Sequence, residues 1–342
     1  MKTPAILAAG LLVASAVTAV LLAASLQPHA AHAEDATVSA HQIPSFMGAG
    51  AGQRVQGVIW RGGIELRSSS DTFGGLSGLR FIDNDSRAVM VSDRGRFVSG
   101  QLIYDEQVRP LSFVGVTTTP IQNSKGADLP RAYARDAEAL ALITRDGVAT
   151  GVRVGFENLT RVADFDLVNG VPHGAARPVT IPDWLSDTRT NQTLEAVCIA
   201  PSTSPVAGST LLLTEGVIDD DGQHSAYLLG RNDRGPLSYQ SGAGTDPTDC
   251  AFLPNGDLVV LERGIQLISF HMRLKRVPAA EVRPGAQMVG ETLLESTGAD
   301  IDNMEAVAVH TAPDGSTRIT IVSDNNFNDW ERSLLLEFSL PE

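Results

Sequence analysis

A two-strand unit recurs five times along this chain of 342 residues, and its repetition restricts the fold more than any other feature. The clearest copy runs from Asp302 to Asn326, where two short apolar strands flank the turn Pro313-Asp314-Gly315. An Asp-Gly pair between alternating or β-branched apolar runs is a strong signal of a β-hairpin. Aligned on the entry of the first strand, the five copies start at Ser77, Glu138, Glu195, Thr248 and Glu305.

The spacing of these copies indicates how the hairpins are arranged. Successive copies are 61, 57, 53 and 57 residues apart, and a period of this size made of short strands is typical of a β-propeller. The last copy is too short for a full period, and residues 55–77 supply the missing length. We therefore predict an all-β, five-bladed propeller closed by its N-terminal strand, with six blades as the alternative. Residues 131–142 have helix-forming composition, but their place in the repeat favours a strand.

The N-terminal residues have the pattern of a secretory signal. Lys2 precedes an apolar run from Ala5 to Ser25, and Ala31-His32-Ala33 matches an A-x-A cleavage site. An uncleaved membrane anchor is the alternative, because the run is close to the length of a bilayer span. We expect residues 1–33 to be a signal peptide, residues 34–54 an extended leader and residues 55–342 a single propeller domain. Such a protein would be periplasmic or secreted and would keep no membrane span after cleavage.

The charge of the chain limits its partners. It has 40 acidic and 26 basic residues, which gives a formal net charge of -14. A surface of this sign repels nucleic acid and anionic membranes, so we expect neither as a partner. The net negative charge favours the binding of cations or simply keeps the protein soluble. We expect a monomer.

The chain has two cysteines, Cys198 and Cys250. Each lies in the first strand of its copy, and the two copies are consecutive. First strands of a propeller converge toward the axis, so the two sulfurs could form a disulfide in an oxidising compartment. Two buried free thiols fit the same pattern.

Acidic residues recur at both ends of the hairpins, and an antiparallel hairpin brings its two ends together. If all five hairpins point the same way, these acids gather at one mouth of the channel. Crowded carboxylates repel one another unless a cation lies among them, and several oxygen ligands suit Ca²⁺ first and Mg²⁺ second. We therefore predict a calcium site; the alternative is that each acid caps a turn or is solvated separately. The candidate ligands are Glu138, Glu195 and Glu305 at strand entries, and Asp93, Glu157, Glu215, Glu262 and Asp324 at strand exits.

No common catalytic motif is present. The chain lacks a G-x-S-x-G elbow, an H-E-x-x-H pair, a P-loop and a dinucleotide fingerprint. The histidines share no repeat position, and His224, after the acidic loop 219–221, is the one to test as a catalytic residue. Arg94, Arg96 and Arg263 follow second-strand acids and are candidates to contact an anionic substrate.

Several short motifs act as a joint signature. They are Val-Ser-Asp-Arg-Gly (91–95), Asp-Ala-Glu-Ala-Leu (136–140), Asn-Gln-Thr-Leu-Glu-Ala (191–196), Pro-Thr-Asp-Cys (247–250) and Asn-Met-Glu-Ala-Val (303–307). Together they resemble the phytase-like family known for "esterase-like activity of phytase", from about residue 55 to the end. The resemblance implies an exported bacterial propeller that hydrolyses phosphoesters or esters, with calcium by analogy with propeller phytases.

Two functions of different classes follow. The first is an exported, calcium-dependent hydrolase of a small anionic phosphoester or carboxylic ester substrate. The second is a non-enzymatic propeller that binds a ligand or an envelope partner, with the metal purely structural. A propeller fold by itself does not decide between them.

Overall fold

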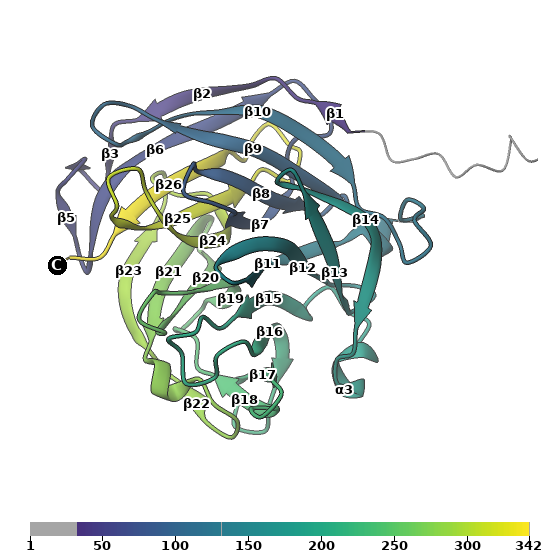
Figure 1. Ribbon diagram of the computed structural model, residues 1–342. Helices are drawn as coiled ribbons and strands as arrows, with labels where there is room; N and C mark the ends of the chain where they lie inside the picture. The colour runs from purple at the N-terminus through teal and green to yellow at the C-terminus, as the bar shows by residue number, and fades with distance from the viewer. Residues whose placement is uncertain (1–32, 131, 342) are drawn as a thin grey trace, which may run out of the picture.

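The computed structural model describes residues 33–130 and 132–341, and they form sheets arranged around a central axis (Figure 1). The predicted signal peptide falls almost entirely outside these residues. Within the described part, no helix is long and apolar enough to cross a membrane.

Each of the first two blades is an antiparallel sheet built from consecutive strands. Blade 1 contains β7 (Leu76–Phe81), β8 (Arg87–Ser92), β9 (Arg96–Tyr104) and β10 (Pro110–Pro120), with β1 (Glu34–Asp35) at its outer edge. Blade 2 contains β11 (Ala137–Arg145), β12 (Val148–Phe156), β13 (Arg161–Val168) and β14 (Val171–Val179).

Blades 3 and 4 follow the same plan. Blade 3 contains β15 (Leu194–Ile199), β16 (Thr210–Ile218), β17 (His224–Leu229) and β18 (Gly235–Tyr239), with β22 (Gln287–Met288) added in parallel. Blade 4 contains β19 (Asp246–Phe252), β20 (Leu258–Gln266), β21 (Ser269–Val277) and β23 (Glu291–Thr297).

Blade 5 joins the two ends of the chain. It contains β24 (Asn303–Thr311), β25 (Thr317–Asp324), β26 (Ser333–Ser339) and the N-terminal strand β6 (Val58–Ser68). Strand β6 pairs antiparallel with β26, and Trp60 on β6 lies opposite Phe338. Their rings pack with centroids 5.2 Å apart. The predicted five blades and the closure by the N-terminal strand are confirmed.

The segment 34–54 is more than a leader. Strand β2 (Val38–Ile43) pairs with β6 at the outside of blade 5, while β1 pairs with β10 of blade 1. Phe46, in the two-residue strand β3 (Ser45–Phe46), is fully buried against Trp60 and Phe338. The segment therefore covers the outer edges of two neighbouring blades, which would otherwise expose unpaired backbone groups.

The innermost strands form a closed circle, because β7, β11, β15, β19 and β24 each contact the next and β24 contacts β7 (Figure 1). These strands are almost wholly buried, and apolar side chains fill the space between adjacent blades. Residues 132–142, which the sequence assigns to a strand, contain both a helical turn and a strand. Helix α2 (Ala132–Arg135) is a single turn, and strand β11 begins two residues later.

A buried ion pair lies among the innermost strands. The guanidinium of Arg80 on β7 donates two hydrogen bonds of 3.0 Å to Asp249 on β19. It also donates to the carbonyls of Val307 in blade 5 (2.8 Å), Cys250 in blade 4 (2.7 Å) and Val197 in blade 3 (3.3 Å). One side chain therefore links four of the five blades.

Cys198 and Cys250 are joined in a disulfide, with 6.0 Å between their Cα atoms. The bond connects the innermost strands of blades 3 and 4. Of the two alternatives open from the sequence, the structure contains the bridge. A closed loop of this length stabilises the folded chain by about 4 kcal/mol in the loop-entropy description.

Candidate functional site

Every innermost strand has a β-bulge at the same repeat position. In each blade the pairing register shifts around one unpaired residue near the start of the strand. A bulge re-aims the side chain of the extra residue, and bulges are common beside active sites. The five bulged residues are Ser77, Glu138, Glu195, Thr248 and Glu305, the same residues on which the repeats align.

The second strands supply a matching set of positions. The residues opposite the start of each hairpin are Asp93, Glu157, Glu215, Arg263 and Asp324. Four of them are acids predicted from the sequence, but blade 4 differs. Glu262 pairs with Pro247, so it stands one position earlier than the other acids, and Arg263 occupies the equivalent place.

Glu262 is therefore not brought to the other acids. Its side chain is fully buried within blade 4 and accepts hydrogen bonds from the hydroxyls of Tyr239 (2.5 Å) and Thr245 (2.7 Å) and from the Gly242 amide. Lys275 Nζ lies 3.8 Å away. These partners satisfy the carboxylate, so its geometry is that of a structural residue.

The remaining predicted acids come together with one that sequence reasoning did not select, Asp136. We call this set the acidic cluster: Asp93, Asp136, Glu138, Glu157, Glu195, Glu215, Glu305 and Asp324. Carboxyls from blades 1, 2, 3 and 5 are close enough to repel one another and to raise one another's pKa values.

Glu157 is at the centre of the cluster. Oxygens of Asp136, Glu138 and Glu157 lie within 4.8 Å of one another, and so do oxygens of Glu157, Glu195 and Glu215. The Thr193 amide donates a 2.9 Å hydrogen bond to Glu157 Oε1, and the Glu195 carboxyl lies beside that of Glu157. Two overlapping groups of three carboxylates thus share one residue.

Burial and like charge hold these carboxyls in an unfavourable environment. Desolvation, followed by repulsion from neighbouring acids, raises the pKa of Glu138 and of Glu195 well above the usual range. Burial raises the pKa of Glu157 to about 6 and that of Glu305 to about 7. A cation bound among these groups would relieve the repulsion and displace their protons.

Arg263 provides positive charge on one side of the cluster. Its guanidinium lies 3.1 Å from Glu305 and 3.5 Å from Glu215, and it donates a 2.7 Å hydrogen bond to Asn303. In the described part of the chain, Glu138, Glu157 and Glu195 form no ion pair with a basic side chain. The cluster is therefore asymmetric: Arg263 balances charge on Glu215 and Glu305, whereas Glu138, Glu157 and Glu195 have no such partner among the described residues.

The other predicted basic residues lie apart from this centre. Arg94 is next to Asp93 and stacks on the ring of Phe327, 3.3 Å from its centroid. Arg96 binds Glu34 (2.8 Å) and Thr118 (3.1 Å) on the outer strands of blade 1, so it is not part of the cluster.

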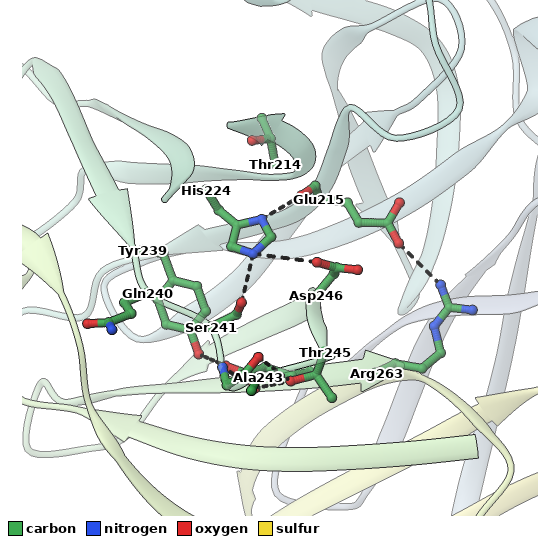
Figure 2. Close-up of polar contacts among 12 residues, drawn as sticks. Thr214, Glu215, His224, Tyr239, Gln240, Ser241, Ala243, Thr245, Asp246 and Arg263 are labelled. Carbon is green, nitrogen blue, oxygen red and sulfur yellow. Dashed lines mark hydrogen bonds and ion pairs between the residues drawn. The ribbon is translucent and has the colours of Figure 1, made fainter. Parts of the chain in front are cut away.

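His224 lies beside the cluster in blade 3 (Figure 2). Its Nδ1 contacts the main-chain carbonyl of Glu215, and its Nε2 lies 2.9 Å from Ser241 Oγ and 3.6 Å from Asp246. Ser241 and Asp246 were not singled out from the sequence, because they match no catalytic motif and are distant from His224 along the chain. Asp136 could have been found, since it is two residues before Glu138.

Most of the chain matches one known protein family. A family model described as "Phytase-like: Esterase-like activity of phytase" matches residues 71–327. The chain belongs to this family. The matched residues include all the hairpins that carry the acidic cluster. A search of curated proteins finds no match. Among solved structures, "Structure of U3-55K" is 10% identical with a TM-score of 0.37, covering 81% of this chain and 98% of that one. The propeller assignment therefore rests on the strand pairing of the phytase-like chain itself.

Proposed function

We propose that this phytase-like propeller is an exported hydrolase that binds Ca²⁺ in the acidic cluster and acts on small anionic phosphoesters or carboxylic esters. The observation that carries the proposal is the pair of overlapping carboxylate groups that share Glu157. The predicted secretory signal supports a periplasmic or secreted location, where calcium is available.

The residues fit a hard cation. The donors are all carboxylate oxygens, which Ca²⁺ prefers, and burial with mutual repulsion raises the pKa of Glu138 and Glu195. Asp136, Glu138, Glu157 and Glu195 would hold the ion, because Arg263 already balances part of the charge of Glu215 and Glu305. A further group of possible ligands, Cys198 with Asp249 and Cys250, is unsuited to a metal because its two sulfurs are bonded to each other.

Bound calcium would supply positive charge that polarises a phosphoryl or carbonyl oxygen of the substrate. The chain's own residues would orient the substrate. Arg94 is exposed at the edge of the cluster, beside Asp93, and its guanidinium could pair with an anionic group. Arg263 keeps Glu215 and Glu305 in fixed positions at the other side of the cluster.

One observation favours a second function. The proposed ligands come from blade 2 (Asp136, Glu138, Glu157) and blade 3 (Glu195), so a cation would link two blades directly. The metal would then be a structural clamp in a propeller that binds a ligand without catalysis.

Activity assays after chelation separate the two functions. We expect p-nitrophenyl phosphate to be hydrolysed with calcium, and chelation to remove this activity. Glu138→Gln should lower it by at least about 100-fold, as loss of an electrostatic contact in an active site does, while the exposed Glu106→Gln should leave it unchanged. Calcium binding without calcium-dependent hydrolysis of p-nitrophenyl phosphate would favour the clamp.

A further inference from the structure

Ser241 and His224 form a close pair at the side of blade 3 (Figure 2). His224 begins β17 and lies opposite Tyr239, the last residue of β18, in the strand register. Ser241 follows β18 by two residues, so the end of one strand brings its hydroxyl next to the first side chain of the other. Ser241 Oγ lies 2.9 Å from His224 Nε2, within the reach required of a nucleophile and its base.

The contact on the other side of the ring fixes the tautomer of His224. Nδ1 faces the main-chain carbonyl of Glu215, and a carbonyl oxygen can only accept a hydrogen bond. In the neutral imidazole Nδ1 therefore carries the proton, and the Nε2 lone pair faces the Ser241 hydroxyl. His224 is 4% exposed, so its ring is held in this orientation by its surroundings.

Asp246 is placed to stabilise the charge that proton transfer creates. Its Oδ1 lies 3.6 Å from Nε2 of His224. When Nε2 accepts a proton from Ser241, the resulting imidazolium lies beside this carboxylate and donates its other N–H to the Glu215 carbonyl.

The pair opens into a pocket of about 520 Å³. Ser241, His224 and the glycine-rich loop 242–244 line one part of it, and Ile218 and Ile265 line another. The two isoleucine side chains are 48% and 72% exposed. The rest of the lining is largely polar, so these two isoleucines are apolar surface beside the serine hydroxyl and suit an ester with a small acyl group.

We propose that Ser241 is a catalytic nucleophile for carboxylic esters, with His224 as its general base, at a site that needs no metal. Ser241 Oγ attacks the carbonyl carbon while its proton passes to His224 Nε2. The tetrahedral intermediate then expels the alcohol, which takes that proton, and an acyl-serine remains. Water attacks the acyl group, His224 accepts a proton from the water, and Ser241 Oγ leaves and recovers it. One ester and one water thus yield one acid and one alcohol.

This site is a neighbour of the acidic cluster but does not rest on the proposed function. Glu215 contributes its side chain to the cluster and its main-chain carbonyl to His224, whereas Ser241 and His224 are not among the proposed calcium ligands. A chelator therefore distinguishes the two sites.

Covalent labelling tests the proposal directly. The full-length protein is treated with a fluorophosphonate in the presence of a chelator, and the modified residue is identified by peptide mass spectrometry. We expect phosphonylation of Ser241 Oγ with release of fluoride, and hydrolysis of p-nitrophenyl butyrate that the chelator does not reduce. Ser241→Ala should abolish the label, and His224→Gln should slow labelling and hydrolysis by about 100-fold or more, the usual loss with a general base.

The control is Ser238→Ala, which changes a half-buried serine of β18, and this variant should be labelled at the wild-type rate. Melting curves of all variants show whether each is folded, and the site of labelling is mapped on the unaltered protein. The proposal is overturned if Ser241 of the folded wild-type protein stays unlabelled, or if folded Ser241→Ala hydrolyses the ester at the wild-type rate. Loss of ester hydrolysis on chelation, with Ser241 unlabelled, would leave only the calcium site.

Discussion

At the scale of single residues, the charged carboxylates of the acidic cluster destabilise the folded state. Most of its carboxyls are buried or half-buried, and their pKa values are raised above 4.5 or 3.8 by desolvation and by one another. The fold nevertheless places these buried, mutually repelling carboxyls at equivalent positions in several blades. Groups of carboxyls with raised pKa values are characteristic of functional sites.

These shifts predict how stability depends on pH when calcium is absent. A carboxyl whose pKa is raised on folding stabilises the folded state fully below its unfolded pKa, and this contribution is lost as the pH rises through the folded pKa. For Glu157 and Glu305 the window runs from about pH 4.5 to pH 6 and pH 7 respectively. With about 1.4 kcal/mol for each pKa unit, the loss is on the order of a few kcal/mol.

Thermal unfolding between pH 5 and pH 8 measures this effect. In chelator we expect the melting temperature to fall across the range, and with calcium we expect a smaller fall. Glu305→Gln removes one of the shifted groups and should flatten the profile in chelator. A melting temperature that rises steadily from pH 5 to pH 7 in chelator would contradict the raised pKa values.

At the scale of elements, the sequence predicts the hairpins and their closure but not their local geometry. Turn residues, with Asp-Gly in two of the hairpins, and the repeat spacing predict five hairpins and the role of the N-terminal strand. The bulges were not predictable, because they depend on the pairing register of two strands. For the same reason Glu262 was aligned with the exit acids, although the register places Arg263 there.

The contact between Ser241 and His224 also depends on register. The end of β18 and the loop after it bring the two side chains together. The spacing of the two residues in the sequence does not predict this contact. Residues 34–54 were read as a leader because they lack a period, yet their short strands pair with the outer edges of blades 1 and 5. Edge strands carry little sequence signal, since only one of their sides is fixed by pairing.

Strand β6 supports a prediction at this scale. Deleting residues 34–68 removes the fourth strand of blade 5 and the strands that cover its edge, and exposes the backbone of β26. We expect the truncated protein to aggregate on size-exclusion chromatography and to lose its cooperative melting transition. A truncated protein that stays monomeric and melts as the full chain does would show that closure by β6 is dispensable.

At the scale of the whole molecule, the five blades are equivalent in fold but not in chemistry. Blade 4 carries Thr248 and Arg263 where blades 2 and 3 carry glutamates, so positive charge enters the cluster from one side. The Arg80–Asp249 pair and the Cys198–Cys250 disulfide tie the innermost strands together. These links hold the bulged residues at fixed separations. The proposed cation site is then formed by the carboxylates of blades 2 and 3.

Calorimetric titration of calcium into chelator-treated protein near pH 6 tests this account most directly, in two buffers of different ionisation enthalpy. We predict saturable binding with release of protons, because the pKa values of the cluster are raised. Glu195→Gln should weaken binding, whereas Glu262→Gln, a buried acid outside the cluster, should bind calcium as the wild type does. Absence of binding heat in both buffers, with a melting temperature that calcium does not change, would contradict the central claim.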